Sequence, residues 1–386
     1  MSTPRLRQSM VRSAADLAQA RRVVVKVGSS SLTTIEGGIS VDALNRLVEA
    51  CQVLRDRGTE VVLVSSGAIS AGLGPLQMQT RPVDLASQQA AAAVGQGLLL
   101  AHYSRAFGMH GTSVSQVLLT VEDLIRRTQY TNALRALEKL LSLGTVPVVN
   151  ENDAVATHEI RFGDNDRLAA LTANLLRADA LILLSDVDSL YDGPPDEGGS
   201  PVARVRSPGD LAGVTLGRRG KAGVGTGGMV TKVEAAQITA GNGIPAFLTS
   251  AGRAAELFKG ETVGTFFEPT GRRRGARSAW LAHLAHTKGR IVIDDGAVAA
   301  VVERNRSLLP AGVTQFSGDF EAGDPVEIAD TKGLICARGL VAYAATELPA
   351  MLGRSTAELG SELGTDYERP VVHSDDMVRV EIARRD

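Results

Sequence analysis

The sequence predicts an α/β protein with a three-layer, mainly parallel open sheet, followed by a second, smaller β-rich domain. Two observations predict the sheet: short β-branched runs alternate with longer amphipathic stretches over the first two-thirds of the chain, and the runs after the first are apolar throughout. A third predicts the second domain, because from about residue 288 short alternating runs, expected to be strands at 289–293, 325–328 and 339–343, are separated by Gly, Asp and Asn. The 386 residues are therefore expected to form two domains.

The strands and helices of the first domain follow from hydrophobic periodicity. We expect strands at residues 23–27, 61–64, 146–149, 181–184 and 244–248, and helices near 86–103, 130–142, 164–177 and 229–241. A further helix is predicted after the first strand by the helical spacing of Leu44, Leu47, Val48, Cys51 and Leu54. Residues 192–201 are polar and rich in Gly and Pro, which is typical of a turn or surface hairpin.

The domain boundaries are placed where the composition changes. Residues 1–20 are expected to form an N-terminal extension, 21–270 the first domain, 271–287 a linker and 288–386 the β-rich domain. The linker prediction rests on the sequence GRRRGAR at 271–277, which has neither periodicity nor apolar content.

The composition indicates a globular protein of the cytoplasm. Hydrophobic residues make up 44% of the chain and charged residues 22%, enough to form a sizeable core. The net charge of −2 provides no global attraction to nucleic acid or to an anionic membrane. Cys51 and Cys336 lack metal or redox spacing, and no apolar run approaches the ~20 residues that span a bilayer.

Small residues and a lysine follow the first predicted strand. Residues 26–31 read KVGSSS, in which backbone N–H groups can approach phosphate oxygens and Lys26 supplies a positive charge. The alternative is a tight turn with a surface lysine. Lys26 favours function, since it is the one charge in an apolar strand, where a structural lysine is costly.

A second small-residue turn, SSGAI at 65–69, follows the next strand and could also present donors to an anion. An ordinary helix cap is the alternative. Two clusters of carboxylates and amides, NEND at 150–153 and GDND at 163–166, could receive the ammonium of an amino acid or orient lysines around ATP. The second cluster could instead only cap the helix that follows it.

The strongest phosphate signal is the glycine loop GVGTGGMVTK at 223–232, which leads into a helix. Glycines allow close backbone approach, the helix N-terminus favours negative charge, and Lys232 can follow a phosphoryl group. A plain mobile loop is the alternative. Ser185 and Asp186 end another strand, where they could touch a nucleotide or form a simple turn.

Taken together, these motifs resemble the glutamate 5-kinases of the amino acid kinase superfamily over nearly the whole chain. VVVKVGSSSLT, VVLVSSGAISAG, PVVNENDAV, FGDND and GTGGMVTK occur in the order and spacing of that family, and YERPVVHSDDM is similar to its C-terminal end. The resemblance implies the amino acid kinase fold with a C-terminal PUA domain. It also implies ATP-dependent phosphorylation of the glutamate side chain to L-glutamyl 5-phosphate, the first step of proline synthesis, with inhibition by proline.

The resemblance also implies roles for individual residues. Lys26 and Lys232 would bind the ATP phosphates, and Asp166 would hold both lysines in position. Ser66, Asp153 and Asn165 would contact glutamate. The implied nucleotide contacts are Lys26, Ser185, Asp186, Thr226, Gly227, Gly228, Met229, Val230, Thr231 and Lys232. Mg²⁺ would bridge the phosphates with few direct protein ligands, and no metal-ligand residue is assigned.

The expected partners are glutamate, ATP, proline as inhibitor, further copies of this chain in a dimer or tetramer, and a glutamyl phosphate reductase that receives the product. Three features depart from the family: Ser185 replaces a common threonine, Val121 replaces a common arginine, and many relatives lack the N-terminal extension. Ser185 keeps the hydroxyl, so we expect no loss there.

Two alternatives are weighed against this hypothesis. Kinases of acetylglutamate, aspartate, carbamate or nucleoside monophosphates share the sheet and the lysines, but NENDAV and FGDND favour glutamate. An RNA-binding or regulatory protein that uses the PUA-like domain is the second alternative. The intact Lys26, Lys232 and Asp166 argue against it, as does the absence of a strong positive charge balance.

Overall fold

The computed structural model describes residues 11–34, 38–120, 123–124, 127–155, 165–214, 228–271 and 287–379. The chain divides into two compact units, residues 1–276 and 277–386. The division falls within the expected linker, most of which lies outside the described residues.

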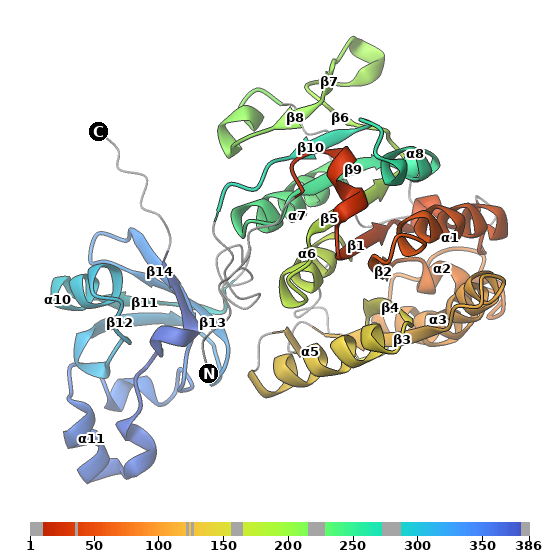
Figure 1. Ribbon diagram of the computed structural model, residues 1–386. Coiled ribbons are helices and arrows are strands. Elements are labelled where there is room, and N and C mark those ends of the chain that lie inside the picture. The colour runs from red at the N-terminus through yellow and green to blue at the C-terminus, as the bar shows by residue number, and fades with distance from the viewer. Residues whose placement is uncertain are drawn as a thin grey trace. The chain divides into compact units, whose positions relative to one another are not determined.

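The first unit contains an eight-stranded sheet (Figure 1). Its order is β3 (Val114–Leu119), β4 (Val146–Glu151), β2 (Glu60–Ser65), β1 (Arg22–Val27), β5 (Ala180–Ser185), β9 (Ala246–Ser250), β10 (Thr265–Phe267) and β8 (Arg204–Val205). Within this sheet, every described pair of neighbouring strands is parallel except β9 with β10. The predicted mainly parallel sheet is confirmed. The strand β3 was not expected, because this edge strand is only partly buried and interleaves Ser and Gln with its apolar residues.

Helices cover both faces of this sheet. One hydrophobic cluster joins alternate residues of β1, namely Val23, Val25 and Val27, to α1 (Val41–Arg55), α3 (Leu85–Gly108) and α8 (Ala254–Lys259). The other face carries α6 (Asn165–Leu175) and α7 (Met229–Gly241), which pack against each other and against the central strands. Because successive side chains of a strand point to opposite faces, Lys26 lies on the α6 side.

Capping side chains fix where α1 and α3 begin, and a glycine allows α3 to pack closely against a neighbouring helix. Ser40 caps α1 and Asp84 caps α3, each accepting a backbone N–H of the first turn. The short helix α2 (Ala68–Leu73) packs tightly on α3. A Cβ on Gly95 would lie 1.8 Å from the Ala68 carbonyl oxygen, so only glycine permits this approach.

The described part of the expected N-terminal extension is integrated into the fold. Residues 11–20 include the short helix η1 (Ala14–Gln19), which contacts α8. Val11 and Leu17 are buried in the same cluster as α1 and β1. Residues 11–20 therefore form part of the core of the first unit.

One further helix and a hairpin also belong to the described first unit. The helix α5 (Arg127–Ser142) contacts β4. The strands β6 (Leu190–Tyr191) and β7 (Pro201–Val202) pair antiparallel. This pairing confirms the hairpin predicted from the polar, glycine-rich composition of residues 192–201. None of the described helices is both long and apolar enough to span a bilayer.

The second unit is built around a five-stranded sheet with its own core. Its order is β12 (Val313–Gly318), β11 (Gly289–Ile293), β13 (Pro325–Ala329), β14 (Ile335–Leu340) and β15 (Met377–Arg379), with the short helices α10 (Asp295–Val298) and α11 (Thr356–Leu363). The β-rich second domain is confirmed. The strand expected at 339–343 was misplaced: it overlaps β14 by two residues, because the strand begins at Ile335 and the chain leaves the sheet after Leu340.

Candidate active site

The predicted site residues gather where the central parallel strands end. Lys26 lies near the end of β1, Ser65 ends β2, Glu151 ends β4 and Ser185 ends β5. These four strands are parallel neighbours, so their carboxyl ends share one edge of the sheet. In open α/β sheets this edge is where ligands bind.

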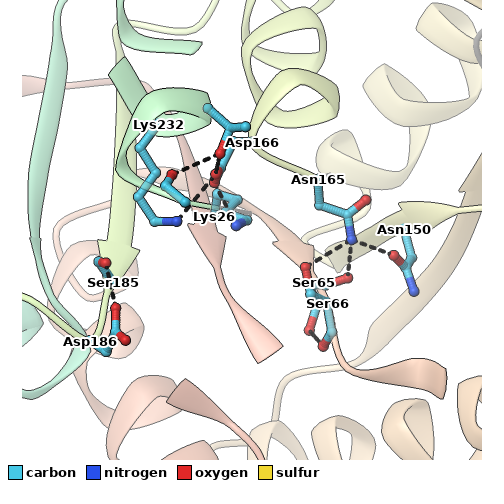
Figure 2. Close-up of polar contacts among 11 residues, drawn as sticks. Lys26, Ser65, Ser66, Asn150, Asn165, Asp166, Ser185, Asp186 and Lys232 are labelled. Carbon is cyan, nitrogen blue, oxygen red and sulfur yellow. Dashed lines mark hydrogen bonds and ion pairs between the residues drawn. The ribbon is translucent and has the colours of Figure 1, made fainter. Parts of the chain in front are cut away.

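A buried charge cluster lies at this edge (Figure 2). Asp166, in the first turn of α6, is completely buried, and Lys26 and Lys232 are 3% and 7% exposed. The Nζ of Lys26 lies 2.5 Å from Asp166 Oδ1, and the Nζ of Lys232 lies 3.2 Å from Asp166 Oδ2. One carboxylate thus holds two lysines from different elements, β1 and α7.

Thr231 completes the surroundings of this carboxylate. Its hydroxyl lies 2.9 Å from Asp166 Oδ2 and 2.8 Å from the carbonyl oxygen of Gly228. Burial alone would raise the pKa of Asp166, but Lys26, Lys232 and the hydrogen bond from Thr231 together hold the pKa below its ordinary value. Asp166 is therefore an anion that orients cations, and a proton-transfer role does not suit it.

The charge balance of the cluster favours an anionic ligand. Two ammonium groups share a single carboxylate, so one positive charge is left uncompensated when all three groups are ionised. An unpaired charge is costly inside a protein, and a phosphate group placed against the lysines would supply the missing negative charge.

The described part of the glycine loop adds donors beside this cluster. Gly228 is the N-cap of α7, and Met229, Val230 and Thr231 form the first turn before Lys232. Their backbone N–H groups are among those that a helix leaves without internal partners, and the helix dipole favours an anion there. Thr226 and Gly227, predicted to contact nucleotide, lie outside the described residues.

A second cluster at the same edge consists of neutral amides and hydroxyls. Asn165, directly before Asp166, donates from Nδ2 to Asn150 Oδ1 at 2.7 Å, to Ser66 Oγ at 3.0 Å and to the Ser65 carbonyl oxygen at 3.1 Å. Figure 2 shows Asn165 turned toward these residues while Asp166 faces the lysines. The first two residues of α6 therefore serve two different clusters.

The loops after β1 and β2 are fixed to each other beside this second cluster. The backbone N–H of Ser66 donates to the Val27 carbonyl oxygen at 3.2 Å. Gly67 then adopts a φ of 106°, a left-handed conformation that glycine tolerates best, and α2 begins. The predicted turn after the second strand is present, and it brings Ser66 within reach of Asn165.

The remaining predicted residues lie at the same sheet edge but outside the two clusters. Asp153 is half-buried in the turn after β4. Ser185 is buried and donates to Asp186 Oδ1 at 3.0 Å, and Asp186 is exposed. The structure thus joins Lys26, Asp166 and Lys232 in one cluster. Asp153 and Ser185 lie at the same sheet edge because Asp153 follows β4 and Ser185 ends β5.

Sequence reasoning missed two polar residues on α3. Gln96 accepts a hydrogen bond from Asn150 Nδ2 at 2.8 Å, and the hydroxyl of Tyr103 lies 2.9 Å from Ser65 Oγ. Both are buried, although α3 is rich in alanine and leucine. A polar residue on the buried face of a helix was the available signal, since buried polar groups need partners.

A protein-held metal ion does not fit the described residues. In the part of the chain that the structure covers, no group of three or more Asp, Glu, His or Cys side chains could hold one. Both oxygens of Asp166 already face Lys26 and Lys232.

Known proteins match both units of the chain. Residues 21–250 match the amino acid kinase family, and residues 289–363 match the PUA domain. The glutamate 5-kinase of Streptomyces avermitilis is 59% identical over 364 residues, covering 94% of this chain and 97% of that protein. The chain belongs to the amino acid kinase family and, within it, to the glutamate 5-kinases. The resemblance inferred from the motifs is confirmed.

A second glutamate 5-kinase and one solved structure are also similar to this chain. The glutamate 5-kinase of Streptomyces coelicolor is 60% identical over 361 residues, covering 93% of this chain and 96% of that protein. Among solved structures, carbamate kinase from Giardia lamblia bound to AMP-PNP is 18% identical, with a TM-score of 0.48, and covers 66% of this chain and 100% of that chain. That likeness is too distant to indicate a substrate.

Proposed function

We propose that the chain transfers the γ-phosphoryl group of ATP to the side-chain carboxylate of L-glutamate, forming L-glutamyl 5-phosphate for proline synthesis. The observation that carries the proposal is the buried cluster in which Lys26 and Lys232 share Asp166. Membership of the glutamate 5-kinases supports the choice of glutamate.

The proposed mechanism relies on charge neutralisation. Phosphoryl transfer spreads negative charge over the oxygens of the migrating group, and fixed cations lower the energy of that state. Lys26 and Lys232 would supply these cations, and Asp166 would keep them in place before ATP arrives. The attacking oxygen belongs to a carboxylate that is already ionised at neutral pH, so no general base is required.

The substrates would occupy the two clusters separately. Ser66, Asn165 and Asp153 would bind glutamate, with the Asp153 carboxylate as one acceptor for its ammonium. The nucleotide would lie along Ser185, Asp186 and the stretch 226–232, with its phosphates at the start of α7.

Mg²⁺ would arrive with the nucleotide. The ion prefers several phosphate and water oxygens and needs few protein ligands. No step of the mechanism proceeds through a protein-bound metal.

Acyl-phosphate trapping tests the reaction. Hydroxylamine converts an acyl phosphate to a hydroxamate, which forms a coloured complex with added ferric iron. The protein is therefore incubated with hydroxylamine, ATP, Mg²⁺ and glutamate, N-acetylglutamate or aspartate in parallel. Hydroxamate should form with glutamate and not with the other two. Equal or greater yield with another acid would reject glutamate as the substrate, and a Lys232→Ala sample is the matched blank.

Regulation and cellular context form part of the same proposal. We expect proline to inhibit the trapping reaction, the chain to form a dimer or tetramer in the cytoplasm, and a glutamyl phosphate reductase to consume the labile product. Proline titration of the assay and light scattering check the first two expectations. The RNA-binding alternative is not favoured, because the lysine cluster is intact in a chain that belongs to a kinase family.

A further inference from the structure

The orientation of Asn150 follows from one backbone group. The N–H of Glu151 lies 2.9 Å from Asn150 Oδ1, and a backbone N–H can only donate. Asn150 Oδ1 is therefore the acceptor, which turns Nδ2 toward Gln96. That Nδ2 donates to Gln96 Oε1 at 2.8 Å.

The orientation of Asn165 follows in the same way. Its Nδ2 lies 3.1 Å from the carbonyl oxygen of Ser65, which can only accept, and 2.7 Å from Asn150 Oδ1, which is already defined as an acceptor. Asn165 Oδ1 is left over. It is buried and has no hydrogen-bond partner among the described residues.

A leftover acceptor suits one part of an amino acid. The ammonium group carries three donors and no acceptor, whereas a carboxylate carries only acceptors. Were Asn165 to turn over, it would present Nδ2 at this position and lose its bonds to Ser65 and Asn150.

Gln96 lies in the part of α3 that packs closely against α2. It is 7% exposed, and Gly95 beside it touches the backbone of α2 at Ala68. Two turns later on α3, Tyr103 bonds to Ser65 Oγ. The same helix thus supports both Asn150 and Ser65, the two residues that orient Asn165.

We propose that Gln96 is a positioning residue for the amino-acid substrate. By accepting from Asn150, it keeps Asn150 Oδ1 directed at Asn165, and Asn165 Oδ1 free to receive the substrate ammonium. This inference rests on the proposed function, because it assumes that glutamate binds beside Asn165. Without the Gln96 oxygen, Asn150 Nδ2 becomes a buried donor with no partner, and Asn150 must move to satisfy it.

Steady-state kinetics of Gln96→Met test the inference. Methionine keeps the length and removes the acceptor. We expect the KM for glutamate to rise about tenfold, the size of one lost buried hydrogen bond, with kcat and the KM for ATP within about twofold. Gln116→Met, the same change at an exposed glutamine on β3, is the matched control and should leave all three constants unaltered.

A double-mutant cycle with Asn150→Ala shows whether Gln96 acts through Asn150. The increase in KM caused by Gln96→Met should disappear in the Asn150→Ala background. An additive effect, an unchanged KM for glutamate, or equal changes in both KM values would overturn the proposal.

Two controls distinguish a wrong role for Gln96 from a variant that does not fold and from a wrong proposed function. Gln96→Ala also removes the side-chain acceptor and should raise the KM for glutamate as Gln96→Met does, and if neither variant folds, Gln96 is a structural residue and the proposal is wrong. If the wild-type protein forms no hydroxamate with glutamate, the proposed function fails first. If it does and the variants match it, only the role of Gln96 is rejected.

Discussion

The two clusters of the site start from adjacent residues of α6 and are built on opposite principles. Asp166 is surrounded by charge, with Lys26 and Lys232 as ion-pair partners. Asn165 is surrounded by neutral groups, with Asn150 and Ser66 as hydrogen-bond partners. Among the residues that the structure describes, the charged cluster has one more positive than negative charge, and Asn165 Oδ1 of the neutral cluster has no hydrogen-bond partner.

In the proposed mechanism, two adjacent residues of α6 therefore serve different tasks: Asp166 serves phosphoryl transfer and Asn165 serves recognition of the substrate. A fixed charge acts strongly where water is excluded, which suits the stabilisation of a migrating phosphoryl group. Neutral hydrogen bonds discriminate by geometry, since a wrong group leaves a buried donor or acceptor unpaired. Changes in the first cluster should therefore affect turnover, and changes in the second should affect substrate binding.

Replacing the shared carboxylate should have the largest effect. Asp166→Asn leaves two buried ammonium groups without a counter-charge, and removing one partner of a buried ion pair lowers the free energy of unfolding by about 3–5 kcal/mol. Turnover should be lost as well. Urea unfolding measures the stability, with Asp186→Asn at the exposed strand end as the control. A loss below about 1 kcal/mol, the range of an exposed pair, would contradict the buried assignment.

Removing one lysine should affect turnover and spare binding. We expect Lys232→Ala to lower kcat about 10²- to 10³-fold, as when one donor to a developing charge is removed, with little change in the KM for glutamate. Lys259→Ala, an exposed lysine on α8, should leave both constants unaltered. Near-normal turnover in Lys232→Ala would refute the phosphoryl role.

A change in the proposed glutamate site should weaken glutamate binding more than it lowers turnover. Asp153→Ala is expected to raise the KM for glutamate about 10- to 100-fold, the range of a lost charge-assisted hydrogen bond, and to change the KM for ATP little. Both constants come from the same initial-rate series. An unchanged glutamate dependence would remove Asp153 from the substrate site.

The smallest effect is the pH dependence of stability. The pKa of Asp166 in the folded protein is held below the ordinary 3.8, so its pairing with Lys26 and Lys232 is fully present above that pH. The contribution is lost as the pH falls through the depressed pKa. The difference in unfolding free energy between wild type and Asp166→Asn should therefore stay constant from pH 7 to about 4 and narrow only below. If this difference in unfolding free energy already narrows above pH 5, Asp166 is not held ionised in the folded protein.

Much of the site could be predicted from the sequence because local patterns encode it. Lys26 stands out as a charge in an apolar strand, and SSG and NEND mark turns at strand ends. The order of the motifs was enough to identify the kinase family. The edge strand β3 gave a weaker signal because it is only partly buried and interleaves polar with apolar residues. The buried Gln96 gave a weaker signal because a single polar residue in a helix rich in alanine and leucine does not by itself show that it is buried.

The sequence by itself determined the α/β class, the parallel strands and the positions of the small-residue and acidic turns, because each depends on neighbouring residues. Only the tertiary structure decided which of these residues meet. Asp166 and Lys232 are 66 positions apart, and Asn150 and Gln96 are 54 apart. Their contacts depend on strand order and helix packing, which arise from the burial of the whole core and leave no local mark in the chain.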